Sequence, residues 1–400
     1  MKEIPLSSES PGPRSKAGGL HVLTLTPFYP SDHDDASGCF VYEPLLWLDQ
    51  TGIENTVYAV QPFYRGTFES RSLRIPAQWI RYFALPGGFG LPTAGAFVFA
   101  HCVGRLRELN RAHPIHLIHA HGALPCGHAA MLLSRELGIP YVVTVHGLDA
   151  YSRVQVRGRA GKWCRRISQN TYMASRRVIC ISEHVREKVL EGVGRNCRTS
   201  VVYNGVDAEL FKPGNLPESN HPVILSVGNL IPVKGHELLI RSVASLMPEF
   251  PSLILEIIGS GFERQKLERI SEQLGCADHV RFLGRKARRE TAAAMQDCTV
   301  FALPSQYEGL GCVYLEAMST GKAAVGCRGQ GIAEIIQQGS NGFLVGPGNE
   351  KELTLVLSML LGDAQRRSNL GRAARQTIVE GLTLAHQAER LVRIYRECAG

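Results

Sequence analysis

Two glutamates that flank a glycine turn are the residues of this sequence best placed to do chemistry. Glu308 and Glu316 stand eight positions apart, and the apolar run 299–303 before them has the β-branched and aromatic residues of a buried strand. Residues 310–320 favour a helix, so Glu308 belongs to the strand-to-helix loop and Glu316 lies more than a turn inside the helix. Because a helix N-terminus offers unpaired amides to anions, this unit predicts a site for a ligand with phosphates at one end and hydroxyls at the other.

A second glycine turn supplies a cation. Residues 228–235 follow a predicted strand, precede a helix and contain Lys234, and this combination suits a diphosphate. An ordinary loop with a solvated lysine is the alternative, but beside the glutamate pair we favour phosphate binding. Gly259 and Arg285 follow the next two strands and are weaker candidates for nucleotide contacts, because a tight turn and a surface role explain them equally well.

Histidines gather in the first half of the sequence. His146 ends a predicted strand, with Gly147 next and Asp149 close by, which favours a hydrogen bond to a sugar hydroxyl or a developing charge over a structural role. His119 and His121 would share one face of a strand, a spacing that can bind metal. No cysteine or acid accompanies them at ligand spacing, so we expect no metal site.

The loop after the first predicted strand is the candidate acceptor side. It contains an Asp-x-Asp pattern within residues 32–35, which loop solvation explains as well as a metal does, and Gly38, which would let an acceptor or a phosphate approach closely.

Short strand-like runs alternate with helical patterns along the whole chain, which predicts parallel sheets covered on both faces. The alternation restarts near Pro222, after a polar run at 213–220. The predicted strands cover residues 21–26, 55–60, 80–85, 117–121, 141–146, 178–182, 201–204, 223–227, 254–259, 280–283, 299–303, 323–326 and 343–345.

Four hundred residues suit two domains rather than one core. We predict a disordered tail at 1–19, a Rossmann-like domain at 20–212, a linker at 213–221 and a second Rossmann-like domain at 222–382. A last helix at 383–400 would pack back toward the first domain. Open parallel sheets bind ligands beyond the carboxyl ends of their strands, so two such sheets should face a shared cleft.

Composition indicates a soluble globular protein, with 44% apolar and 20% charged residues and no run long enough to span a membrane. Eleven scattered cysteines without framework spacing favour reduced thiols in a cytosol. The net charge is +8, and residues 151–188 alone hold ten basic and two acidic residues. This stretch between Arg153 and Lys188 fits an anionic partner such as a membrane surface, and equally fits a solvated helix face.

The motifs, taken in order, resemble retaining glycosyltransferases of family 4, which have the GT-B fold. The stretch from Glu308 to Glu316 is similar to the family's paired-glutamate motif, and the ordered set covers most of the chain, from about residue 21 to residue 394. The other matching motifs are His146-Gly147-x-Asp149, Ser182, Tyr203-Asn204-Gly205-Val206-Asp207, Lys234-Gly235, Phe282-Leu283-Gly284 and Gly331-x-x-Glu334.

The resemblance implies that the domain at 20–212 is the acceptor side and that the domain at 222–382 binds the nucleotide sugar. It also implies a role for each matching residue. Glu316 would bind the ribose hydroxyls of the donor, Glu308 the donor sugar, and Lys234 the diphosphate. The remaining donor contacts would come from the backbone of Gly309, Leu310 and Gly311, from His146 near C6 of the sugar, and from Arg285 near the base.

Two departures from the family pattern stand out. Asn229 occupies the position of the usual arginine, so the diphosphate loses one cationic partner. The glycine loop after the first strand is reduced to residues 37–39 around Gly38, which leaves the acceptor side least defined.

The sequence therefore predicts transfer of a sugar, with retention, from a nucleotide diphosphate sugar to a hydroxyl of a glycan or lipid-linked acceptor. The setting would be cell-surface polysaccharide or glycolipid assembly, in the cytoplasm or at the inner face of the membrane. A GT-B nucleotide-sugar epimerase or hydrolase and a silent sugar-nucleotide-binding protein are the alternatives. We expect no cofactor and no metal, because lysine and backbone dipoles would neutralise the diphosphate. We also expect no nucleic acid, since the basic stretch has few stacking aromatics.

Overall fold

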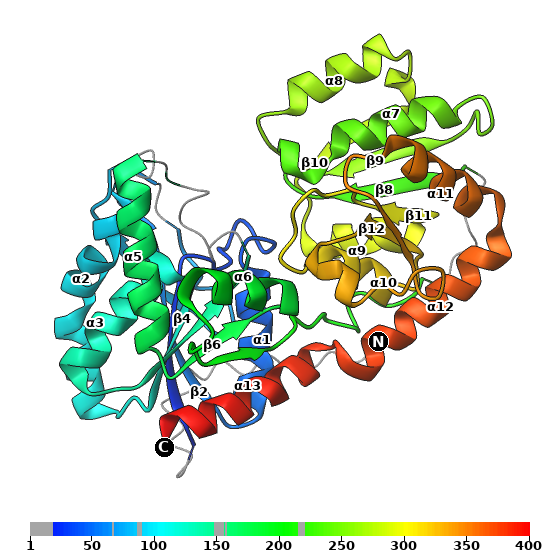
Figure 1. Cartoon of the computed structure of the whole chain (residues 1–400). Coiled ribbons are helices and arrows are strands. Elements are labelled where there is room, and N and C mark those ends of the chain that lie inside the picture. The colour runs from blue at the N-terminus through cyan, green and yellow to red at the C-terminus, as the bar shows by residue number, and fades with distance from the viewer. Residues whose placement is uncertain (1–18, 66–67, 86–89, 148–155, 157, 215–220) are drawn as a thin grey trace.

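The chain forms two parallel sheets in two lobes (Figure 1). The computed structural model describes residues 19–400 except 66–67, 86–89, 148–155, 157 and 215–220, so most of the predicted tail lies outside it. The predicted α/β class with two Rossmann-like domains is confirmed, since every strand pairing within both sheets is parallel.

The first sheet has seven strands in the order β3-β2-β1-β4-β5-β6-β7. They are β1 His21–Thr26, β2 Glu54–Pro62, β3 Ala77–Tyr82, β4 Leu117–His121, β5 Tyr141–Val145, β6 Arg177–Cys180 and β7 Thr199–Val201. The second sheet has six strands in the order β10-β9-β8-β11-β12-β13. They are β8 Val223–Val227, β9 Ile254–Ile258, β10 Val280–Gly284, β11 Val300–Ala302, β12 Ala324–Cys327 and β13 Phe343–Val345. The predicted linker at 213–221 falls between β7 and β8.

Two predicted strands were shifted along the chain. The strand predicted at 80–85 is β3, which pairs with β2 from Ala77 to Tyr82, and the chain leaves the sheet at the exposed Phe83. The strand predicted at 201–204 is β7, which lies at Thr199–Val201, where its pairing with β6 ends. Asn204 instead turns its side chain to Gln387 and Cys312, because the chain there is already leaving the first sheet.

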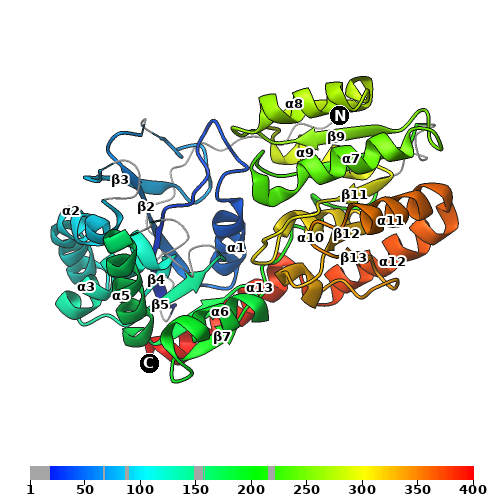
Figure 2. The same cartoon turned by 45° about the horizontal axis from the view of Figure 1, so that its top comes forward.

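Helices cover both faces of the first sheet, as alternation along its strands requires. Leu23 and Leu25 of β1 pack in one core with Val98 of α2 (Leu91–Ala112), whereas Val22 packs in another with Leu45 of α1 (Cys39–Gln50). Figures 1 and 2 show α2, α3 and α5 together on one side of this sheet, and α1 and α13 on the other. The helices of this lobe are α1 Cys39–Gln50, α2 Leu91–Ala112, α3 His128–Leu137, α5 Gly158–Ala174 and α6 Glu183–Val193.

The last helix returns from the second lobe to the first (Figure 1). α13 Leu384–Ala399 buries Leu391 and Tyr395 in the core that α1 shares with the first sheet. A backbone bridge between Val206 and Thr383 fixes the start of this return. The second lobe holds α7 His236–Leu246, α8 Arg264–Gln273, α9 Arg288–Asp297, α10 Cys312–Ser319, α11 Glu350–Gly362 and α12 Ala364–Gly381. None of the helices in the described ranges has the length and apolar character to span a bilayer.

Candidate active site between the two domains

A pocket of about 380 Å³ lies between the two domains and gathers most of the residues singled out from the sequence. Its wall contains His146 from the first domain and, from the second, Asn229, Lys234, Gly259, Arg285, Glu308, Gly309, Leu310, Gly311 and Glu316. They meet because each follows a parallel strand, and the strands of each sheet point their carboxyl ends to this edge. Asp149 lies outside the described residues.

The glycine turn after β11 brings the two domains into contact. A Cβ on Gly309 would lie 2.7 Å from the carbonyl oxygen of His146, so no larger residue fits this approach. The Gly309 carbonyl accepts a hydrogen bond of 2.6 Å from the Ser182 hydroxyl of the first domain. Gly311 has a φ of 83° and is the N-cap of α10, and Gly311, Cys312 and Val313 line the pocket, so the N-terminus of this helix lies in the pocket wall.

Glu308 is paired with the lysine predicted to hold phosphate. Lys234, in the 3-10 turn Pro232–Lys234 after β8, donates a hydrogen bond from Nζ to Oε1 of Glu308. The Ser305 hydroxyl donates to the same oxygen at 3.2 Å, and the glutamate is only 8% exposed. An ammonium and a carboxylate are thus preorganised side by side at the mouth of two strand-to-helix turns.

Glu316 is held by an arginine that sequence reasoning missed. Arg288 donates from Nη1 to Glu316, and its Nη2 lies 2.8 Å from Oε1 of Glu43, which belongs to α1 of the first domain. The guanidinium also lies over the ring of Phe211, 4.7 Å from its centroid. Burial raises the pKa of Glu43 to about 7, and Arg288 opposes that rise. The sequence places Arg288 a few residues after a predicted strand, but its partner Glu43 lies far away along the chain.

Three other predicted residues make close contacts with neighbouring segments of the chain. A Cβ on Gly259 would lie 1.9 Å from the Gly228 carbonyl oxygen, so this glycine lets two strand-end turns touch. Gly38 has a φ of 73°, and a Cβ there would meet the backbone of Tyr29 at 2.4 Å. Arg285 lines the pocket, and its Nη2 donates to Asp34 of the first domain at 2.6 Å.

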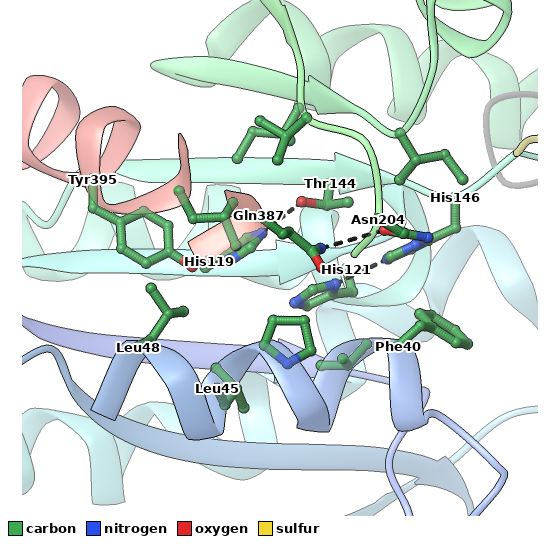
Figure 3. Close-up of a pocket in the computed structure, with 16 residues that line it drawn as sticks. Phe40, Leu45, Leu48, His119, His121, Thr144, His146, Asn204, Gln387 and Tyr395 are labelled. Carbon is green, nitrogen blue, oxygen red and sulfur yellow. Dashed lines mark hydrogen bonds between the residues drawn. The ribbon is translucent and has the colours of Figure 1, made fainter. Parts of the chain in front are cut away.

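The imidazole of His146 is packed between aromatic rings at the inner end of the pocket. The ring centroids of Phe40 and Phe28 lie 4.9 and 5.8 Å from that of His146. Its Nε2 lies 2.9 Å from Nδ1 of His121 (Figure 3). Burial lowers the pKa of His146 to about 3, so the ring is neutral near pH 7. A neutral imidazole can donate one hydrogen bond and accept another.

Among the residues that the structure describes, side chains with metal-ligating atoms meet where His21, Glu54 and His113 come together, away from the pocket. Both ring nitrogens of His21 already have partners, since Nδ1 lies 3.1 Å from the Pro114 carbonyl and Nε2 2.9 Å from the Thr56 hydroxyl. The trio is therefore explained by hydrogen bonding between β1, β2 and the turn before β4.

Two parallel-sheet domains with a carboxylate-rich, cation-containing pocket between them define a GT-B glycosyltransferase. The family comparison agrees: residues 207–377 match the family described as "Glycosyl transferases group 1", and residues 40–210 match "Glycosyltransferase Family 4". The chain belongs to this glycosyltransferase family, as the sequence motifs indicated.

Curated relatives carry glycosyltransferase names. The chain is 30% identical to a D-inositol 3-phosphate glycosyltransferase of Corynebacterium urealyticum, over 70% of its own length and 71% of that protein. It is 26% identical to a GDP-mannose-dependent alpha-(1-6)-phosphatidylinositol monomannoside mannosyltransferase of Mycolicibacterium smegmatis, over 85% and 90% of the two chains.

Solved structures share the fold at low identity. A sucrose-phosphate synthase from Thermosynechococcus elongatus superposes with a TM-score of 0.77 at 18% identity, covering 94% of this chain and 98% of that one. Anabaena HepE in complex with UDP gives a TM-score of 0.75 at 21% identity, covering 94% and 100%. These likenesses establish the GT-B architecture.

Proposed function

We propose that this glycosyltransferase moves a sugar from a nucleotide diphosphate sugar to an acceptor hydroxyl with retention at the anomeric carbon. The observation that carries the proposal is the single pocket in which Lys234, Glu308, Glu316 and the N-terminus of α10 meet. Cationic and amide donors suit a diphosphate, and the buried carboxylates suit sugar and ribose hydroxyls. Anabaena HepE, which shares the fold, was solved with UDP and with UDP-glucose.

The charges of the pocket match those that develop during transfer. As the bond between C1 of the sugar and the β-phosphate oxygen breaks, negative charge grows on the phosphate and positive character on the sugar. Lys234 and the α10 amides stabilise the negative charge on the phosphate, and Asn229 contributes hydrogen bonds but no charge. The departing β-phosphate oxygen takes the acceptor proton while the new C1–O bond forms on the same face of the sugar.

Glu308 positions the donor sugar rather than attacking it. Its Oε1 already accepts hydrogen bonds from Lys234 and Ser305, which anchors the carboxylate beside the phosphate site. A carboxylate nucleophile would have to sit on the opposite face of the sugar ring from the leaving group. With this chemistry the reaction needs no metal, because Lys234 and the backbone dipoles neutralise the diphosphate.

A second hollow, of about 450 Å³, supports an acceptor site in the first domain. It adjoins the donor pocket through the segment before α1, since Asp34 lines the hollow and binds Arg285 of the donor pocket. Gln61 lies in its wall, 4% exposed, and Oε1 has no hydrogen-bond partner in the described part of the chain. Aromatic walls and an amide suit a sugar ring, so we assign a glycan or lipid-linked acceptor to it.

We also propose that the protein lies in a reducing cytoplasm and binds peripherally to the inner face of an anionic membrane. The described face of α5 exposes Arg159, Lys162 and Arg166 beside Trp163, and this helix contains no acidic residue. Arg153 and Arg157 lie outside the described residues. Basic side chains bind anionic headgroups in a salt-dependent way.

Flotation with anionic vesicles tests the membrane proposal. Replacing Arg159, Lys162 and Arg166 by Ser should weaken binding at low salt. The matched control replaces three exposed arginines of the second domain, Arg269, Arg289 and Arg372. Equal binding by both triple variants would refute the proposal.

A donor panel tests the catalytic proposal. Purified protein is given UDP-, GDP- and ADP-sugars, and nucleoside diphosphate release is measured with and without lipid-linked acceptors. Acceptor-dependent release with an α-configured product supports retaining transfer. Donor consumption without a glycoside would identify an epimerase or hydrolase, and calorimetric donor binding without turnover would identify a silent binding protein.

A further inference from the structure

The two histidines of β4 have different surroundings, although both point toward α1 and α13 and both are buried (Figure 3). His119 is 2% exposed and uses both ring nitrogens: Nδ1 lies 2.6 Å from the Tyr395 hydroxyl and Nε2 lies 2.7 Å from the Thr144 hydroxyl. It joins β4, β5 and α13, which is the usual role of a satisfied core histidine.

His121 is not satisfied in this way. Its Nδ1 lies 2.9 Å from Nε2 of His146, and the two rings stack at 15° with centroids 5.2 Å apart. Its Nε2 is buried and has no hydrogen-bond partner in the part of the chain that the structure describes. An unsatisfied buried polar group is destabilising, so packing alone would favour an apolar side chain here. The His121–His146 bond is the one described interaction that calls for a histidine.

The bond between the two rings couples their protons. Burial lowers the pKa of both His121 and His146, so each ring is neutral near pH 7 and carries one proton. A hydrogen bond between two neutral imidazoles contains one proton, donated either by His121 or by His146. If His121 donates from Nδ1, the one proton of His146 is on its Nδ1, and if His146 donates from Nε2, that proton is on Nε2. The tautomer of His146 is therefore coupled to that of His121.

We propose that His121 is a positioning residue that fixes the tautomer and the ring plane of His146 at the donor pocket. His121 does not line that pocket, whereas His146 lines both the pocket and the small cavity that His121 faces. Phe40 and Phe28 pack on the His146 ring, and His121 anchors its Nε2, so the ring presents one orientation to the sugar. The consequence for turnover rests on the proposed function; the consequence for the tautomer does not.

Nitrogen-15 NMR of the histidine rings tests the proposal without any substrate. Two-bond nitrogen–proton correlations distinguish rings protonated on Nδ1 from those protonated on Nε2, and His146→Gln assigns the His146 signals. In His121→Leu, we expect the His146 pattern to change to the other tautomer or to a mixture. In His119→Gln, the matched control on the same strand, it should stay unchanged. An unchanged His146 pattern in His121→Leu would overturn the proposal.

Two further measurements keep the test decisive. If His121→Leu does not fold, His121→Asn retains a polar group and should give an intermediate pattern, and a wild-type pattern there overturns the proposal. With a donor that the panel shows to be turned over, His121→Leu should lower kcat/KM by about tenfold to a hundredfold, the loss typical when a partner that orients a metal-ligating histidine is removed. The affinity for the free nucleoside diphosphate should stay unchanged, and a loss there would overturn the assignment. If the panel finds no turnover, the proposed function fails while the NMR result stands by itself.

Discussion

Arg288 and Glu43 form a two-pronged ion pair between the domains, with Nη2 of the arginine 2.8 and 3.0 Å from the two carboxylate oxygens. The same guanidinium binds Glu316, whose carboxylate we assign to the donor ribose. One buried arginine therefore connects the arrangement of the two domains to the nucleotide end of the pocket.

Replacing Arg288 by Met should lower the free energy of unfolding by about 3–5 kcal/mol, because two buried carboxylates lose their counter-charge. The matched control is Arg281→Met, whose partner Glu256 is 3.5 Å away at an exposed site. That variant should lose less than about 1 kcal/mol. Urea unfolding measures both, and equal losses would contradict the assigned role of Arg288.

Glu316→Gln should weaken the binding of a nucleoside diphosphate by about tenfold, because a neutral amide forms weaker hydrogen bonds to ribose hydroxyls than a carboxylate does. Calorimetry with UDP, GDP and ADP measures the loss. Glu272→Gln, an exposed glutamate at the end of α8, serves as the control. Undiminished affinity in the Glu316 variant would remove this residue from the nucleotide site.

Lys234→Ala should reduce turnover by about two orders of magnitude, since it removes the cation placed to stabilise charge on the leaving diphosphate. The control is Lys266→Ala, which removes an exposed lysine that binds Glu237 and Glu263. This variant should keep the wild-type turnover. The measurement is nucleoside diphosphate release with the best donor. Activity like that of the wild type in the Lys234 variant would refute the phosphate role.

Acid should destabilise the fold before carboxylates titrate. Burial lowers the pKa of His119 to about 3, whereas in the unfolded chain it is about 6.5. Below pH 6.5 His119 binds a proton in the unfolded chain, whereas in the folded chain it stays neutral. The free energy of unfolding is therefore at its full value above pH 6.5 and decreases as the pH falls toward 3. At pH 5 the loss is about 2 kcal/mol, and His121 acts in the same direction.

The control for this pH effect is His119→Gln. Urea unfolding at pH 7 and at pH 5 should show a difference that is about 2 kcal/mol smaller in the variant than in the wild type. The same pH difference in both proteins would show that His119 is not the group responsible.

The fold could be predicted from the sequence because its strands are buried on both faces and appear as apolar runs. Most of the site could be predicted for a related reason: its residues stand in the loops after those strands, where a parallel sheet binds ligands. Lys234, Glu308 and Glu316 all follow a strand and stand near a glycine turn, so a local pattern indicated them.

Contacts between distant segments could not be predicted in this way. Glu43 precedes Arg288 by 245 residues, and no sequence pattern near either residue indicates that the two are in contact. Glu334 likewise accepts hydrogen bonds from the amides of Glu183 and His184 in the first domain, which only the folded arrangement reveals. His121 appeared in the sequence as half of a metal-like pair, and its bond to His146 depends on the register of β4 against β5.

The chain passes between the lobes twice, outward after β7 and back through α12 and α13 (Figure 2). These two connections lie side by side, since Val206 after β7 is paired with Thr383 before α13. Substrate exchange should therefore use a hinge-like swing at this junction, while sliding or twisting of one lobe past the other would strain α13 against α1.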